Sequence, residues 1–262
     1  MTQTIVQVDS FTDRRFAGNP AAVCIMESAA NEGWMQDVAR EMNLSETAFL
    51  FPKGDEYHLR WFTPLVEVDL CGHATLASAH VLFEDHGHPP DKPIRFVTRS
   101  GVITAKKKGD WIEFDFPASP VNETTPPGGL LEALGVVPKF VGKSQTDYLI
   151  EVESDSAVRE VQPNFGSLAS LPVQSVTVTG RNSKGEIDFT SRFFAPAIGI
   201  DEDPVTGFAH TLLAPYWSQV LGKKELEAYQ ASARGGVLRL RLEGDRVCIA
   251  GQAIIVLRGE LV

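Results

Sequence analysis

The sequence has few cysteines and no long apolar run. Its three cysteines, Cys24, Cys71 and Cys248, are odd in number, lie far apart and form no Cys-x-x-Cys pair. Neither a disulfide framework nor a structural zinc site is therefore predicted. No apolar stretch approaches the roughly 18 residues of a membrane-spanning helix, and the N-terminus lacks the pattern of a secretion signal. These absences predict a cytoplasmic protein of a reducing compartment, with no membrane partner.

Positive charge is also scarce. Lysine and arginine total 24 against 34 aspartate and glutamate residues, which gives a formal net charge of -10. This charge works against nonspecific binding to nucleic acid or to an anionic membrane, so no nucleic-acid partner is predicted. The 262 residues, 43% hydrophobic and 22% charged, have the proportions of a globular protein with one large domain or two smaller ones.

The chain contains an internal duplication. Residues 60–68 align without gaps on residues 192–200, a shift of 132 that preserves the pattern Arg-aromatic-Phe-x-Pro. Further along, the shift becomes 135, and Gly72 then aligns with Gly207. Because the matches keep their order at nearly the same shift, duplication is favoured over chance.

Each half contains the same predicted elements. Alternating β-rich runs indicate one hairpin in each half, and an apolar stretch before each hairpin indicates a helix too apolar for a surface. The hairpins are expected at 102–105 with 111–116 and at 237–242 with 246–250, and the apolar helices at 74–84 and 208–221.

These elements predict an α+β fold of two pseudo-symmetric β-roll domains, each wrapped around a central helix. The domains are expected at 1–118 and 119–262, with the last strand able to pack back on the first domain. Smaller outer helices are expected at 32–42 and near 154–161. Two similar domains imply a cleft between them, and such clefts commonly bind small ligands.

The aligned glycines mark the starts of the two central helices. The first N–H groups of a helix lack partners within it, and the helix dipole favours negative charge there. One interpretation is therefore that a substrate carboxylate is held at Gly72-His73 or at Gly207-Phe208. The other is that both glycines merely allow tight turns, and the spacing does not separate the two.

Cys71, His73 and Asp203 are candidate proton carriers. At the shift of 132, Asp203 aligns with Cys71, so both residues precede a central helix. Asp203 before Pro204 is also typical of a helix N-cap. A metal site needs three or four converging ligands, so Cys71-x-His73 alone predicts none, and Cys71 can equally be an inert buried thiol. A histidine at a helix start is expected to be neutral near pH 7 and suited to proton relay.

Glu46 lies between the helix expected to end near Met42 and an apolar stretch. Asn43-x-x-Glu46 has capping-box spacing, but the residues that follow, 47–51, are more typical of a strand. A carboxylate desolvated at the start of a buried strand could exchange a proton with carbon. On spacing alone, a solvated surface acid is the simpler interpretation.

At these segments the sequence resembles the PhzF-like isomerases of the phenazine biosynthesis family, which share their fold with diaminopimelate epimerase and proline racemase. The resemblance implies two β-roll domains around central helices, no cofactor or metal, and a homodimer. The stretches that carry it are 8–12, 16–20, 43–47, 60–64, 71–75 and 202–207.

The resemblance also implies roles for single residues. Glu46 stands where PhzF has its general acid/base, and His73 and Asp203 stand where the family binds substrate and relays protons. Cys71 lies near the first of the two opposed cysteines of the epimerases, but the second motif has no cysteine, so a two-thiol racemase is not implied. Phe208 replaces the family's usual serine and loses its hydroxyl, so the PhzF substrate itself is not implied.

The sequence thus predicts a cofactor-independent isomerase that moves a proton between carbons of a small carboxylate-bearing metabolite. Glu46 would abstract and return the proton, while His73 and Asp203 would orient the substrate or relay protons. The substrate-binding group is expected to comprise Gly72, Gly207, Phe208 and Cys71.

Two alternatives stay open. The first is a Cys71-dependent epimerase or racemase of an amino or hydroxy acid, for which Asp203 is the candidate partner acid. The second is a catalytically retired homologue that binds a metabolite or a protein, an alternative motivated by Phe208.

Overall fold

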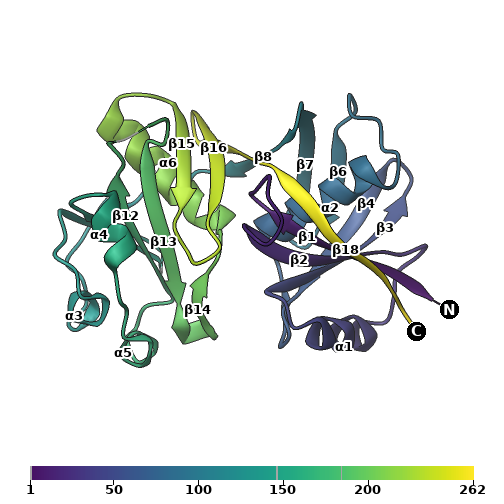
Figure 1. Cartoon of the computed structure of the whole chain (residues 1–262), viewed down its shortest axis with the longest axis horizontal. Helices are drawn as coiled ribbons and strands as arrows, with labels where there is room; N and C mark the ends of the chain where they lie inside the picture. Colours follow the sequence, from purple (N-terminus) through teal and green to yellow (C-terminus); the bar gives the residue numbers. More distant parts are fainter. Residues whose placement is uncertain (1, 146, 184) are drawn as a thin grey trace. The chain divides into compact units, whose positions relative to one another are not determined.

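The chain folds into two compact units. The computed structural model describes residues 2–145, 147–183 and 185–262 (Figure 1). The first unit contains Met1–Asp115 together with Ile249–Val262, and the second contains Phe116–Cys248. Within the described residues, no helix is both long and apolar enough to cross a membrane.

The first unit wraps strands around helix α2. Strand β1 is antiparallel to β2 and β18, β2 is parallel to β3, and β3 is antiparallel to β4. Strand β4 is antiparallel to β5 and parallel to β6, and β7 is antiparallel to both β6 and β8. The elements are β1 (Gln3–Ser10), β2 (Asn19–Ile25), α1 (Glu32–Met42), β3 (Glu46–Lys53), β4 (Glu56–Phe62), β5 (Glu67–Val68), α2 (Gly72–Glu84), β6 (Ile94–Thr98), β7 (Gly101–Lys108), most of β8 (Trp111–Pro117) and β18 (Ala253–Leu261).

The second unit wraps strands around helix α6. Strand β10 is antiparallel to β9 and β11, β11 is parallel to β12, and β12 is antiparallel to β13. Strand β13 is antiparallel to β14 and parallel to β15, which is antiparallel to β16. The elements are β9 (Asn122–Glu123), α3 (Leu130–Leu134), β10 (Phe140–Ser144), β11 (Asp147–Val152), α4 (Asp155–Glu160), α5 (Phe165–Ala169), β12 (Ser175–Arg181), β13 (Phe189–Ala195), η1 (Pro196–Ile198), β14 (Ile200–Asp203), α6 (Gly207–Leu221), β15 (Glu225–Gln230), β16 (Gly236–Glu243) and the first half of β17 (Arg246–Gly251).

The two units repeat one topology. In each, a long strand, β4 or β13, is antiparallel to the strand before it and to a short strand after it, and parallel to the strand that follows the central helix. The predicted α+β fold of two pseudo-symmetric β-rolls, each around a central helix, is therefore confirmed. The predicted helices are present as α1, α2, α4 and α6.

Helix α2 has no polar face. Between His73 and Phe83, every residue except His80 is buried. Hydroxyl groups in this helix donate hydrogen bonds to carbonyls one turn earlier, as Ser78 Oγ does to the carbonyl of Ala74 at 2.7 Å. A helix that is apolar on all sides must be covered on all sides, and α2 contacts β1, β2, β3 and β18.

Helix α6 is also largely buried and contains a proline. Pro215 has no N–H to donate to the carbonyl of Thr211 one turn earlier. The N–H of Ser119 donates to that carbonyl instead, at 3.0 Å. A loop residue from the same unit thus satisfies the acceptor that the proline leaves without a helical donor.

The aligned arginines make the same interactions in both units. Arg60 bonds to both carboxylate oxygens of Glu67 at 2.6 and 2.5 Å, and Arg192 does so with Glu202 at 2.7 and 2.9 Å. Each guanidinium also lies over the ring of the phenylalanine two residues later, with its central carbon 5.2 Å or 5.0 Å from the ring centroid. The repeated Arg-aromatic-Phe pattern is therefore a repeated packing unit.

The substitution Arg192→Met tests this role. The side chains of Arg192 and Glu202 are only 11% and 20% exposed, so the variant leaves a carboxylate without its cation in a poorly solvated place. We expect a loss of about 1.5–3 kcal/mol in the free energy of unfolding, measured by urea titration. The control is Arg40→Met, whose pair with Asp37 is 60% and 74% exposed and should contribute no more than about 1 kcal/mol. Equal losses in the two variants would contradict this account.

Candidate active site

Glu46 is the first residue of β3 and lies opposite Ala21 of the parallel strand β2. Helix α1 ends at Met42, and its C-cap residue Asn43 adopts the left-handed conformation with φ 50°. The chain therefore turns away from the helix before Glu46, and no capping box forms. The Glu46 side chain is 13% exposed, so the interpretation of a solvated surface acid is wrong.

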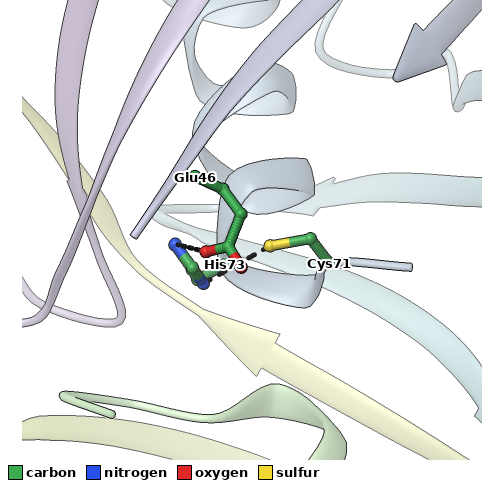
Figure 2. A group of neighbouring side chains, drawn as sticks. All are labelled: Glu46, Cys71 and His73. Carbon is green, nitrogen blue, oxygen red and sulfur yellow. Dashed lines mark hydrogen bonds and ion pairs between the residues drawn. The ribbon is translucent and has the colours of Figure 1, made fainter. Parts of the chain in front are cut away.

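The start of α2 brings two more of the predicted residues to Glu46. Cys71 is the N-cap residue of α2, and His73 is the second residue of the helix. His73 Nδ1 lies 3.5 Å from Cys71 Sγ, and His73 Nε2 lies 3.2 Å from Glu46 Oε2 (Figure 2). A thiol, an imidazole and a carboxylate thus point toward one another in the first unit.

The His73 ring is neutral at physiological pH. Burial lowers its pKa to about 3, and a hydrogen bond with the backbone of Pro20 only partly opposes this effect. Nε2 lies close to Glu46 Oε2 but forms no hydrogen bond with it. Catalytic hydrogen bonds are often poorly aligned before substrate binds, so the contact suits a relay that aligns in the complex.

Hydrogen bonds fix the backbone at the start of α2. Ser10 Oγ, at the end of β1, donates to the carbonyl of His73 at 2.8 Å, and Thr75 Oγ1 donates to the carbonyl of Cys71 at 2.5 Å. Ser10 was not among the predicted site residues. Its importance comes from a contact 63 residues away in sequence, which no local pattern indicates.

The N-termini of the two central helices lack side-chain caps, unlike those of α1, α4 and α5. Asn31 caps α1, Ser154 caps α4 and Asn164 caps α5. Neither α2 nor α6 has a side-chain cap or an acidic residue in its first turn. The positive ends of these two dipoles are therefore not offset by a carboxylate of their own first turn, which favours an anion there.

Asp203 belongs to the second unit and ends β14 in a buried position. The N-cap residue of α6 is Thr206, so the interpretation of Asp203 as the cap is wrong. Thr206 Oγ1 donates to the Asp203 carboxylate. Gln230 Nε2 donates to the carbonyl of Asp203, and Gln230 Oε1 accepts from the N–H of Thr206, both at 2.8 Å.

Gly207 and Phe208 are the first two residues of α6, and Phe208 is 42% exposed. One turn further, His210 is fully buried, and its Nδ1 lies 2.8 Å from the carbonyl of Thr206. Burial lowers the pKa of His210 to about 4. His210 and Gln230 were not predicted, because a histidine within an apolar helix and a glutamine at the end of a strand are common features without a site.

Glu46, Cys71 and His73 together meet the minimum for a metal site. One potential ligand atom from each lies within 4.8 Å of the other two. The prediction of no metal rested on only two nearby ligands, and the fold adds Glu46 as a third. Three ligands are the number that catalytic zinc sites draw from the protein.

Comparisons with known proteins agree with this fold. Residues 8–259 match the family model of phenazine biosynthesis-like proteins. An uncharacterized isomerase of Halalkalibacterium halodurans is 53% identical over 262 residues, which cover all of this chain and 99% of that one. The crystal structure of a PhzF-family protein from Enterococcus faecalis matches with a TM-score of 0.96 at 38% identity over the whole of both chains. A hydroxyproline epimerase of Agrobacterium vitis, 10% identical over 99% of this chain and 92% of that one, shares the fold with a TM-score of 0.66.

These observations define an isomerase with an epimerase-like fold. The chain belongs to the phenazine biosynthesis-like family, the PhzF family, over nearly its whole length. As an isomerase, it is not the catalytically retired homologue considered as an alternative.

The buried His73 makes stability depend on pH. Its pKa is about 3 in the folded state against 6.5 when solvated, so the unfolded chain binds more protons between these values. The stabilisation from keeping this ring neutral is complete above pH 6.5 and is lost as the pH falls toward 3. We expect His73→Gln to reduce the slope of unfolding free energy against pH, between about pH 6 and about pH 4, by about 1.4 kcal/mol per pH unit.

The measurement is urea unfolding at a series of pH values. The control is His86→Gln, because His86 is exposed, and it should keep the slope of the natural protein. A His73→Gln variant with an unchanged slope would show that the His73 ring is solvated.

Proposed function

We propose that this isomerase moves a proton between carbon atoms of a small carboxylate-bearing metabolite without a cofactor, and that Glu46 is the general acid/base. The observation that carries the proposal is the contact of the largely buried Glu46 carboxylate with the His73 imidazole at 3.2 Å. Acid/base catalysis requires a proton carrier held in place and shielded from bulk water. The start of β3 provides that position.

The ionisation of His73 supports Glu46 as the base. A ring whose pKa is lowered to about 3 does not hold a second proton at neutral pH, so it is a poor store for a proton taken from carbon. A neutral imidazole can still donate from one nitrogen and accept at the other. We therefore assign proton abstraction and return to Glu46, and orientation or relay to His73.

The start of α2 supports an anionic substrate. Removing a proton next to a carboxylate places negative charge on the substrate in the transition state. The uncapped first turn at Gly72 and His73 carries a partial positive charge beside Glu46. Each well-placed N–H donor can be worth roughly 3–4 kcal/mol to such a transition state.

Asp203, Gly207 and Phe208 stay predicted substrate contacts. Local support comes from the second unit, where the Asp203 carboxylate is held by Thr206 and the first turn of α6 has no side-chain cap. This environment suits a carboxylate that orients a substrate or passes on a proton. The homodimer and the cytoplasmic location also stay predictions.

A second candidate base is Cys71. Its Sγ lies 3.5 Å from His73 Nδ1 at the N-cap of a helix, a place where a thiolate is stabilised. In this version the protein would be an epimerase or racemase of an amino or hydroxy acid, with Cys71 removing the proton and Asp203 as partner acid.

The substitution Glu46→Gln tests the main proposal. A panel of small carboxylates is incubated in heavy water with the natural protein, and deuterium uptake into carbon is followed by mass spectrometry. For every compound that exchanges, we expect Glu46→Gln to slow exchange by about 10²- to 10⁴-fold, because the amide cannot carry the proton. Glu41→Gln, at an exposed position on α1, should keep the natural rate. Full exchange by a folded Glu46→Gln protein would remove Glu46 from the mechanism.

The substitution Cys71→Ala separates the two candidate bases. If Glu46 is the base, the exchange rate should fall by no more than about tenfold in Cys71→Ala, because general acid/base catalysis remains. This loss is smaller than the one expected in Glu46→Gln. Cys24→Ala, at another buried cysteine, is the control for losing a thiol. A loss in Cys71→Ala as large as that in Glu46→Gln would favour the thiol mechanism.

A further inference from the structure

The donor atoms of Glu46, Cys71 and His73 form a chemically mixed set. A thiol sulfur, an imidazole nitrogen and a carboxylate oxygen lie within 4.8 Å of one another (Figure 2). Thiolate and imidazole select borderline and soft divalent cations such as Zn²⁺, whereas Mg²⁺ and Ca²⁺ prefer sites made of oxygen. The composition of the cluster therefore points to one class of metal ion.

The spacing of the sulfur and the imidazole fits such an ion. Bonds of about 2.3 Å to sulfur and about 2.0 Å to nitrogen, at a tetrahedral angle, place the two ligand atoms about 3.5 Å apart. The observed distance from Cys71 Sγ to His73 Nδ1 is 3.5 Å. The Glu46 carboxylate completes three protein ligands and leaves a fourth position for water.

The surroundings of the ring also fit. An imidazole that binds a metal through one nitrogen generally places its other nitrogen against a carboxylate or a backbone carbonyl. The His73 ring has such a neighbour in the backbone of Pro20, which acts on its pKa. The backbones of Cys71 and His73 are themselves held by Thr75 and Ser10, so two of the three ligands start from fixed positions.

We propose that Glu46, Cys71 and His73 bind one Zn²⁺-class cation, and that this binding reversibly inhibits the isomerase. The Cys71 thiol releases its proton to solvent, the sulfur, nitrogen and carboxylate oxygen bond to the ion, and the ion loses water ligands. No electron is transferred. The inhibition rests on the proposed function: a carboxylate bound to the metal cannot abstract a proton from carbon, and the ion occupies the space beside it.

Metal binding is measured without any turnover, by titrating the metal-stripped full chain with Co²⁺ as a coloured substitute for Zn²⁺. We expect one equivalent to give a thiolate-to-cobalt charge-transfer band together with the strong visible bands of four-coordinate Co²⁺, and Zn²⁺ to abolish both. Cys71→Ala should lose the charge-transfer band, while Cys24→Ala and Cys248→Ala, at the other two buried cysteines, should keep it.

The Glu46→Gln variant tests the third ligand. It should keep the charge-transfer band but bind Co²⁺ at least about tenfold more weakly, since even the loss of an outer partner has an effect of this size. No charge-transfer band in the natural protein, or a band that survives in Cys71→Ala, would overturn the metal site. Circular dichroism of each variant shows that it is folded.

Inhibition is measured separately, through deuterium exchange at increasing Zn²⁺, with each variant normalised to its own zinc-free rate. We expect half-inhibition of Cys71→Ala to need at least about tenfold more Zn²⁺ than the natural protein. An exchange rate that stays unchanged at Zn²⁺ concentrations that abolish the Co²⁺ bands would overturn the inhibitory role. If no carboxylate exchanges at all, the proposed function and the inhibition fail together, while the Co²⁺ spectra still decide the metal site.

Discussion

The burial of α2 on all sides is the constraint on which the candidate site depends. This helix has no polar face, so the strands of its unit must surround it, and it contacts β1, β2, β3 and β18. Its first turn consequently lies where β1 ends and β3 begins. Ser10, the last residue of β1, holds the backbone of His73, and Glu46, the first residue of β3, meets the His73 ring. Core packing and catalytic geometry thus have the same cause.

The same burial determines the chemistry of the three side chains. Desolvation keeps the His73 ring neutral, which leaves the proton-carrying role to Glu46 or to Cys71. The dry surroundings and the short distances that favour proton transfer also bring a carboxylate, an imidazole and a thiol to the spacing of metal ligands. A site of this composition is therefore expected to be sensitive to zinc even when its reaction needs no metal.

Much of the fold could be predicted from the sequence because the chain repeats itself. The alignment of Arg60 with Arg192 locates equivalent strands, and the unbroken apolar stretch after each glycine identifies a buried helix. Glu46 could be placed at the start of a strand because the residues after it are typical of β-structure. The partners Glu67 and Glu202, and the closeness of Glu46 to His73, depend on strand pairing between distant segments, which no local pattern contains. Asp203 was open to interpretation as a cap because Asp-Pro is common at helix starts, whereas Thr206 takes that position.

The charge state of His73 in the folded protein tests the central claim most directly. Nitrogen-15 NMR of labelled protein distinguishes an imidazole that carries one proton from an imidazolium that carries two. The account predicts a singly protonated His73 ring near neutral pH that stays so as the pH falls below 6.5, the value of a solvated histidine. A doubly protonated ring near neutral pH, or a ring that titrates near 6.5, would contradict it.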